Sequence, residues 1–356
     1  MNKGNIVNDF RIKQSLETIQ KLLENNNKMI ILSHLGRPTE GVYDESLSLK
    51  PICKYLSALL ERDIKFFNSY RDNMNFEDYE IAMLENVRFN TGEKSSNSDL
   101  SKAYASLADY FVFDAFGVAH RKESSTFGVS EYLKTYPGLN ISNEIHTINQ
   151  LINEDSRPMT IIISGAKVST KLIVIQKLLA KCDFMILGGG ILNTFLKAKG
   201  NEIGNSLYEE DLVNEAKNIL SSDFSSKIIF PIDLSCESES KPKNIDVSNI
   251  SKNDIIFDVG EKSLEHIKSI INKSAAIFWN GPLGYVEKEP FDRGTIELAK
   301  TIAEHNCFSI IGGGDTLPII ENLNLQSQFS CLSTGGGSLL SYLEGGDLPI
   351  LDKLDL

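Results

Sequence analysis

Short apolar runs alternate with amphipathic segments along nearly the whole chain. The runs are rich in Ile, Val, Leu and Phe and predict buried strands, whereas apolar positions between them recur at helical spacing. Because near-continuous apolar strands separated by helices are typical of parallel sheets covered on both faces, the pattern predicts an α/β fold. The predicted strands cover residues 29–33, 81–84, 111–114, 160–164, 184–187, 228–232, 275–279 and 308–311. The predicted helices cover residues 47–60, 101–108, 143–154, 171–181 and 295–305.

The predicted helix over 143–154 is followed by Asp155-Ser156-Arg157-Pro158, which breaks the pattern before a new series of strands begins. We therefore predict a domain join at 154/155 between two α/β halves of similar size. The segment 235–253 is polar and rich in Ser, Lys and Asn, so it predicts an exposed excursion.

Composition narrows the classes of partner. The chain has 356 residues, 41% hydrophobic and 24% charged, with a net charge of −12, which argues against nucleic acid and anionic membranes as partners. No apolar run is long enough to span a bilayer, and the first ten residues lack a signal-peptide pattern. The five cysteines form no CxxC pair, which favours a reducing, cytoplasmic location.

Three apolar runs end in three consecutive glycines, at residues 184–190, 308–314 and 329–337. Glycine lets the backbone turn sharply and approach a ligand, leaving amide N–H groups free to face an anion. A single copy fits a tight turn equally well, but three copies at strand ends favour a nucleotide phosphate site. One copy runs directly into Asp315 and Thr316, a carboxylate suited to Mg²⁺ and a hydroxyl suited to phosphate.

The first half places basic side chains where predicted strands end. Ligands of parallel α/β sheets sit at those ends, and the arginine fork suits carboxylate and phosphate. A position on the solvated surface is a sufficient explanation for any one of these basic side chains. It is a poor explanation for the whole set, because the protein as a whole is acidic. We therefore predict a pocket for a small, multiply anionic metabolite. Its candidate residues at strand ends are His34, Arg37, Arg88, His120 and Arg121, and Arg11 joins them from an early segment that is expected to open a helix.

The second half carries a further candidate turn, SGAKVSTK, at residues 164–171. It does not fit the P-loop pattern, and the dinucleotide fingerprint fails because Asn193 stands where glycine is needed. A dehydrogenase is therefore disfavoured. Lys167 and Lys171 lie near a helix start, where cations are unfavourable unless an anion is bound, so we expect both to face phosphates. The only tryptophan, Trp279, is expected in the core.

The ordered motifs DFRI, SHLGRP, MLENVRF, DAFGVAHR, GAKVSTK, GGGILNTFLKAKG, WNGPLG, GGGDT and STGGG resemble those of the phosphoglycerate kinase family, nearest to its proteobacterial type. The likeness runs from about Gly4 to the C-terminus. It implies two Rossmann-like parallel-sheet domains facing a cleft, in a monomer. Residues 1–154 would bind the acidic metabolite and residues 155–337 the Mg-nucleotide, while residues 338–356 would return to the N-terminal domain.

The resemblance also implies roles for individual residues. The reaction is reversible phosphoryl transfer from 1,3-bisphosphoglycerate to MgADP, giving 3-phosphoglycerate and MgATP, with domain closure bringing the sites together. Arg11 and Lys167 would be catalytic, and Asp315 would hold Mg²⁺ together with the nucleotide phosphates. The implied substrate-binding residues are Arg11, His34, Leu35, Gly36, Arg37, Arg88 and Arg121. The implied nucleotide-binding residues are Lys171, Asn280, Glu287, Gly313, Gly314, Asp315 and Thr316.

Three departures from the family pattern bear on function. Ser164 stands where glycine is usual, and Glu123 stands where many members have His or Gln, adding negative charge near the anion site. The family's opening strand and turn, of the type VxxRxDxNVP, has no match here, which predicts a missing central strand and neighbours with unpaired edges. The alternative function is therefore a non-catalytic nucleotide-binding member or an inactive fragment, with Met1 an internal methionine.

Overall fold

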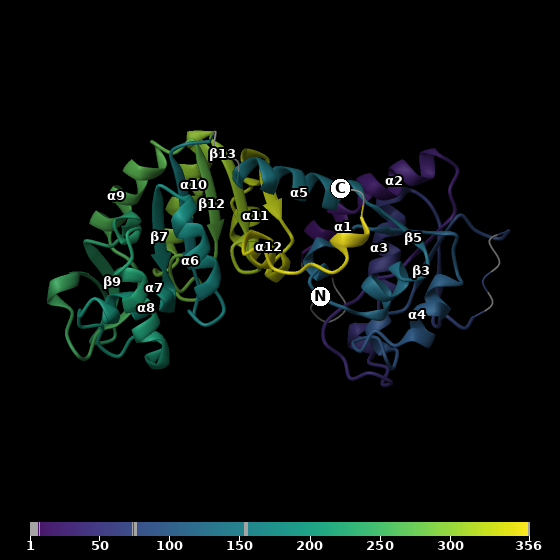
Figure 1. Cartoon of the computed structure of the whole chain (residues 1–356), viewed down its shortest axis with the longest axis horizontal. Coiled ribbons are helices and arrows are strands. Elements are labelled where there is room, and N and C mark those ends of the chain that lie inside the picture. The colour runs from purple at the N-terminus through teal and green to yellow at the C-terminus, as the bar shows by residue number, and fades with distance from the viewer. Residues whose placement is uncertain (1–5, 7, 73, 75–76, 153–155, 355–356) are drawn as a thin grey trace. The chain divides into compact units, whose positions relative to one another are not determined.

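The structure is a computed structural model that describes residues 6, 8–72, 74, 77–152 and 156–354. The chain forms two compact units (Figure 1). The first unit contains Met1–Glu144 together with Asp347–Leu356, and the second contains Ile145–Gly346. Met1, Gly4 and the expected join at Glu154-Asp155 lie outside the described residues.

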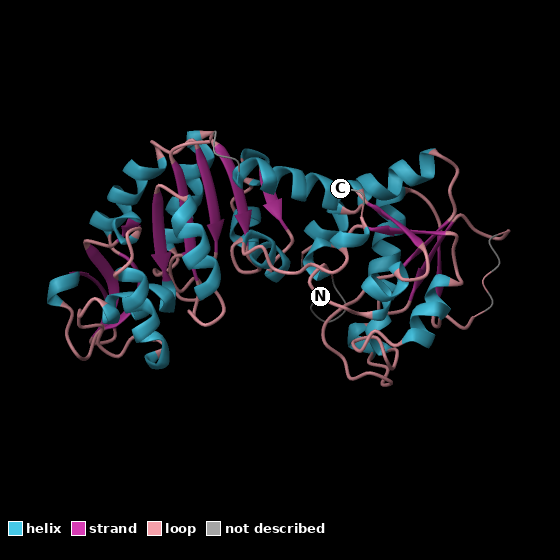
Figure 2. Cartoon of the chain, viewed as in Figure 1, coloured by secondary structure: helices cyan, strands magenta, loops and turns pink. Residues whose placement is uncertain are grey.

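The second unit is built on a six-stranded sheet in the order β14-β13-β12-β6-β7-β8, with every neighbouring pair parallel. Figure 2 shows these strands side by side with helices flanking them. Because the strands are parallel, the turns that follow them gather at one edge of the sheet. The strands are β6 (Met159–Ser164), β7 (Phe184–Gly188), β8 (Ile228–Ile229), β12 (Ala276–Asn280), β13 (Phe308–Gly312) and β14 (Cys331–Ser333).

The sheet is buried on both faces. The central strands β6 and β12 have every residue buried, and Trp279 is fully buried as expected, with its indole N–H donating to the Gly281 carbonyl at 2.7 Å. Helix α6 packs against α12, α7 against α8, and α9 against α10. The helices of the second unit are α6 (Leu172–Lys181), α7 (Gly189–Ala198), α8 (Val213–Leu220), α9 (Glu261–Ile271), α10 (Arg293–His305), α11 (Leu317–Asn322) and α12 (Gly337–Leu343), and α5 (Leu139–Ile152) begins in the first unit and ends in the second.

The polar segment 235–253, expected as an exposed excursion, belongs largely to a second sheet. Strands β9 (Asp233–Ser238), β10 (Lys241–Asp246) and β11 (Ile255–Val259) form an antiparallel sheet in the order β10-β9-β11. Glu239 and Ser240 take φ angles of 50° and 61°, the left-handed pair that suits a two-residue hairpin turn. Most side chains of β10 are exposed, so its sequence lacks the continuous apolar run that predicts a buried strand.

The first unit contains two smaller parallel sheets, β1-β3-β2 and β4-β5. Strand β3 is buried on both faces, since Ala82 and Leu84 join one apolar cluster and Met83 joins another. Among the described residues, β1 pairs only with β3 and β4 only with β5. The strands are β1 (Met29–Ile31), β2 (Ile64–Phe67), β3 (Ile81–Leu84), β4 (Tyr110–Phe113) and β5 (Lys134–Pro137). The helices are α1 (Phe10–Gln14), α2 (Leu16–Glu24), α3 (Lys50–Leu60) and α4 (Ser98–Ala105).

The α/β prediction is confirmed, with mainly parallel sheets in both units. All five cysteines are free, and three of them are buried. No helix in the described residues is both long and apolar enough to cross a membrane.

Candidate functional site

Hydrogen bonds from the turn after β3 hold the turn after β1 in place. The buried Asn86 side chain donates to the carbonyl oxygens of Leu35, at 2.8 Å, and Leu47, at 3.0 Å, and accepts from the Arg88 backbone N–H at 3.1 Å. Gly36 has a φ of +64°, and a Cβ there would lie 2.6 Å from the Leu47 side chain. Only glycine fits this turn without strain, so the SHLGR segment keeps a defined path past Arg88.

Arg88 is the buried member of the basic set. It lies in a short 3₁₀ turn, Val87–Phe89, directly after β3, and is only 4% exposed. Its Nη1 donates to the Gly36 carbonyl at 2.7 Å, which ties the two strand-end turns together. Burial lowers the pKa of Arg88, with Glu123 acting in the opposite direction. Burying a guanidinium charge in this way is energetically unfavourable unless an anionic group lies next to it.

The basic groups predicted at separate strand ends converge around His34. Burial, and after it the positive charges of Arg88, Arg121 and Arg11, lower the pKa of His34 to about 4, so the imidazole is neutral near pH 7. We call Arg11, His34, Arg88 and Arg121 the basic cluster. Arg37 is exposed, and no contact of its side chain is recorded in the described part of the chain. Arg11 is exposed on α1.

Glu123 lies within the basic cluster. One of its carboxylate oxygens, Oε1, is 3.5 Å from Arg88 Nη2 and 3.3 Å from Arg121 Nη1. Arg121 also donates from Nε to His120 Nε2 at 3.3 Å. A second carboxyl, that of Glu93, is fully buried beside Ser125, and burial raises its pKa to about 7. The first unit thus pairs Arg88 and Arg121 with the carboxylate of Glu123 and buries a second carboxyl, that of Glu93, nearby.

In the second unit, the candidate groups gather where the strand order reverses. The chain proceeds from β6 outward to β7 on one side, and later places β12 on the other side of β6. Such a switch point, at the carboxyl ends of the strands, is where open α/β sheets bind ligands. Gly281, with φ +98°, allows close approach here, because a Cβ would lie 2.1 Å from the Ser164 carbonyl oxygen.

Lys171 bridges the ends of β6 and β12 at this switch point. Its ammonium donates to the Ser164 carbonyl at 2.5 Å and to Asn280 Oδ1 at 2.7 Å. Burial lowers the pKa of Lys171 to about 8, and the negative charge of Asp315 opposes this change. The Ser164 hydroxyl donates to the Pro282 carbonyl, so this departure from the family's glycine adds a tie between the same two strands.

The turn after β13 is open toward solvent. Gly313 has a φ of +117°, which favours glycine, whereas a Cβ at Gly314 would meet no atom of the chain within 4 Å. The absence of a side chain at Gly314 is therefore not required by internal packing. Asp315 is exposed, and Thr316 is fully buried with a hydroxyl that has no partner among the described residues. The open turn suits a ligand that comes close to the backbone.

Other predicted residues lie apart from these contacts. Lys167 and Glu287 are exposed, so Lys167 does not share the buried setting of Lys171. The turn that carries both lysines is tied down by Glu209, which accepts from the Ser169 backbone N–H at 2.8 Å and from its hydroxyl at 2.7 Å. Sequence reasoning missed Asn86 and Glu209, because their partners lie far away along the chain and no motif spacing marks them.

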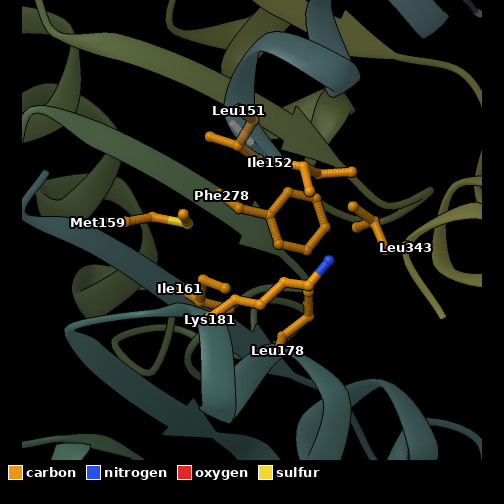
Figure 3. A pocket seen from close by; sticks show the side chains of 8 residues that line it. All are labelled: Leu151, Ile152, Met159, Ile161, Leu178, Lys181, Phe278 and Leu343. Atoms are coloured by element: carbon orange, nitrogen blue, oxygen red, sulfur yellow. The ribbon is translucent and has the colours of Figure 1, made fainter. Parts of the chain in front are cut away.

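A small hollow in the second unit is not a candidate for either ligand. It is lined by apolar side chains, among them Leu151, Met159, Phe278 and Leu343, and by the side chain of Lys181 (Figure 3). Such a lining offers too few polar groups to hold a phosphate. The candidate site is therefore the set of strand-end turns.

The fold and these turns define an α/β protein of the doubly wound, parallel-sheet class. The family model described as "Phosphoglycerate kinase" matches residues 1–346. The phosphoglycerate kinase of Francisella tularensis subsp. novicida is 42% identical over 358 residues, covering 99% of this chain and 91% of the relative. That of Legionella pneumophila is 43% identical over 353 residues, covering 97% of this chain and 89% of the relative.

Solved structures agree with the sequence comparisons. The phosphoglycerate kinase from Coxiella burnetii matches with a TM-score of 0.87 at 38% identity, covering 99% of this chain and 92% of that one. The Pyrococcus horikoshii enzyme matches with a TM-score of 0.86 at 29% identity, with the same coverage. The chain belongs to the phosphoglycerate kinase family. Coverage of nine tenths of these relatives does not favour the alternative of an inactive fragment.

Proposed function

We propose that this chain transfers a phosphoryl group reversibly from 1,3-bisphosphoglycerate to MgADP, giving 3-phosphoglycerate and MgATP. The observation that carries the proposal is the position of Lys171, a buried cation held at the switch point of a parallel sheet and close enough to Asp315 for its charge to be felt. A buried ammonium next to an open glycine turn suits a phosphate chain.

The first unit would bind the acidic metabolite through the basic cluster. Arg88 and Arg121 offer forked N–H donors, and Arg11 adds positive charge. His34 is neutral near pH 7, so it would act as a hydrogen-bonding group. The Leu35-Gly36 backbone, held by Asn86 and Arg88, would set the position of the ligand, and the exposed Arg37 would close over it.

The second unit would bind the nucleotide around Lys171 and Asn280, with residues 313–316 against the phosphates and Glu287 near the ribose. The described residues contain no group of three or more His, Cys, Asp and Glu side chains placed to hold a metal. Asp315 nevertheless fits Mg²⁺, because magnesium bound to nucleotides typically takes one or two carboxylates and completes its shell with phosphates and water. When bound, Mg²⁺ would neutralise charge on the phosphate oxygens.

The transfer needs no covalent intermediate with the protein. An oxygen of the ADP β-phosphate attacks the 1-phosphoryl phosphorus, and the bond from that phosphorus to the carboxyl oxygen of the metabolite breaks. The electron pair stays on the carboxylate that leaves. Arg11 and Lys167 would balance the charge of the transferring group, and Lys171 would keep the nucleotide in position. We also propose that the protein acts in the cytoplasm, in keeping with its free cysteines. We further propose that it acts as a monomer.

A coupled spectrophotometric assay of the purified chain tests the proposal, with 3-phosphoglycerate and MgATP as substrates. We expect turnover that is proportional to protein concentration and needs both substrates. Arg121→Ala should raise the KM for 3-phosphoglycerate and leave the KM for ATP unchanged. Absence of turnover by a folded, purified chain would reject the proposal and favour a non-catalytic member of the family.

A further inference from the structure

We propose that the Glu123 carboxylate is an internal counter-ion that occupies part of the anion-binding site, so that an anionic substrate must displace it from Arg88 and Arg121. This inference rests on the proposed function of the basic cluster. It makes Glu123 a determinant of substrate affinity that acts against binding.

The contacts of Glu123 place a negative charge where the substrate's own charge would go. Its Oε1 lies 3.5 Å from Arg88 Nη2 and 3.3 Å from Arg121 Nη1, so a single oxygen is shared by both guanidinium groups. The side chain of Glu123 is 9% exposed and that of Arg88 is 5% exposed, whereas that of Arg121 is 33% exposed. A ligand from solvent therefore meets Arg121 first, on the accessible side of this ion pair.

Each arginine already uses two of its nitrogens, and Arg88 Nε is buried without a partner among the described residues. Arg88 Nη1 donates to the Gly36 carbonyl and its Nη2 faces Glu123. Arg121 donates from Nε to His120 and from Nη1 to Glu123. A carboxylate or phosphate that binds a guanidinium side-on needs two adjacent N–H groups, and each such pair on Arg121 contains one of these occupied nitrogens. Bidentate binding to Arg121 thus competes directly with Glu123 or with His120.

The segment around Glu123 is fixed, and the Glu123 side chain also takes part in a capping box with Thr126 at the start of residues 124–128. The Glu123 N–H donates to Thr126 Oγ1 at 3.2 Å, and Ser124 N–H donates to the Glu93 carbonyl at 2.8 Å, which anchors the segment on both sides. The other acid facing this cluster is Glu93, whose pKa the charge of Glu123 helps to raise. Because the pKa of Glu93 is raised to about 7, Glu93 becomes protonated as pH falls below neutrality, and Glu123 then supplies the main negative charge here.

Two opposite effects follow from this arrangement. Without substrate, Glu123 compensates the buried charge of Arg88 and stabilises the first unit. With substrate, the same carboxylate repels the incoming anion and holds donors that the anion needs. Removing its charge should therefore weaken the free protein and strengthen substrate binding. A residue that only maintained the fold would not change stability and affinity in opposite directions.

The test compares Glu123→Gln with wild type by calorimetric titration with 3-phosphoglycerate and by thermal melting. We expect the Kd and the KM for 3-phosphoglycerate to fall about tenfold, because a like charge is removed from a partly buried anion site. The KM for ATP should not change. The melting temperature without ligand should fall, and the shift on adding 3-phosphoglycerate should grow.

The matched control is Glu24→Gln, which removes the same charge from the same unit. Glu24 ends α2 and pairs only with Lys21 among the described residues, at 3.1 Å on an exposed surface, where such a pair contributes little. It should leave the Kd unchanged. In an Arg121→Gln background, Glu123→Gln should lose most of its effect, which shows that the competition acts through Arg121. If Glu123→Gln does not fold, Glu123→Asp carries the test, since its shorter carboxylate should tighten binding several-fold.

Unchanged or weaker binding by folded Glu123→Gln would overturn the inference, provided that wild type binds 3-phosphoglycerate. If wild type does not bind it, the proposed function fails, and inorganic phosphate then serves as the probe. Tighter phosphate binding by Glu123→Gln would still support the counter-ion. Equal phosphate binding by the two proteins would reject it.

Discussion

The two units prepare for anions in different ways. The first relies on charged side chains, with Arg88 and Arg121 balanced by Glu123 before any ligand is present. The second relies mainly on backbone, with glycines at the strand ends and one buried cation, Lys171, which is held by oxygens of uncharged groups. In the proposed function, the first site is tuned by a single internal charge, whereas the second depends on close approach of the ligand to the main chain and on keeping Lys171 protonated.

The largest expected effect comes from Lys171→Met, which leaves the Ser164 carbonyl and Asn280 Oδ1 without their donor. Turnover should fall about 100- to 1000-fold, the range for loss of one preorganised charged group. Steady-state kinetics with varied MgATP measures it, and the exposed Lys217→Met is the control. Activity above a tenth of wild type would show that the second site does not depend on its buried cation.

The next effect concerns the buried acid of the first unit. The pKa of Glu93 is raised from 4.5 to about 7, so folding favours the protonated carboxyl over the carboxylate. The contribution of protonated Glu93 to the free energy of unfolding is therefore fully present below pH 4.5 and is lost as pH rises to about 7. Glu93→Gln should therefore gain stability relative to wild type between pH 4.5 and 7.5, by on the order of 3 kcal/mol at most.

Thermal or denaturant unfolding of both proteins at the two pH values measures the Glu93 effect. The contribution of His34 cancels in this difference, because both proteins carry it. Its pKa of about 4 would change stability in the opposite direction, adding stability as pH rises from about 4 to 6.5. A difference between variant and wild type that stays constant with pH would show that Glu93 does not titrate in the folded protein.

Arginine variants distinguish the buried member of the basic cluster from the accessible one. Arg121→Ala should weaken 3-phosphoglycerate binding by about 1–3 kcal/mol, the value of a charged hydrogen-bonded contact. Arg88→Ala should weaken binding to a similar degree and also lower the melting temperature, because it releases Gly36 and leaves Glu123 with less compensation. Calorimetric titration with 3-phosphoglycerate and thermal melting of both variants measure the two effects. Normal binding by both would mean that the basic cluster is only a charged surface.

The smallest effect is expected at Asp315, an exposed carboxylate for which we propose a role in holding Mg²⁺. Asp315→Ala should weaken MgADP binding about tenfold, in line with the modest contribution of one exposed carboxylate to a shared Mg²⁺ shell. Titration with ADP in the presence and in the absence of Mg²⁺ separates the effect of the metal from that of the carboxylate itself, since ADP alone should bind the variant at least as well as wild type. An equal loss in both titrations would contradict the metal role.

Much of the fold follows from the sequence pattern, because buried parallel strands are continuous apolar runs. Every predicted strand has a counterpart, from β1 to β13. Of the missed strands, β2 and β11 are short apolar runs that the prediction passed over, whereas β5 and β10 break that rule. Strand β5 contains Lys134 and Pro137, and β10 exposes most of its side chains. Their pairing comes from neighbouring strands and from the hairpin turn, which composition does not reveal.

The sequence pointed to the side chains of the candidate site, but much less to their geometry. Strand-end positions singled out His34, Arg88 and Arg121, and the structure brings these side chains close enough for the two arginines to lower the pKa of His34. The contact of Glu123 with Arg88 joins residues 35 positions apart, so no local pattern could show it. The different settings of Lys167 and Lys171, four residues apart, likewise arise only when β12 packs beside β6.

The most direct test of two separate sites is hydrogen exchange of the intact chain, measured by mass spectrometry with MgADP alone and with 3-phosphoglycerate alone. MgADP should protect peptides that contain residues 164–171, 280–287 and 313–316. The metabolite should protect peptides that contain residues 34–37, 86–88 and 120–123. Protection of the same peptides by both ligands, or protection by the metabolite confined to the second unit, would contradict the account.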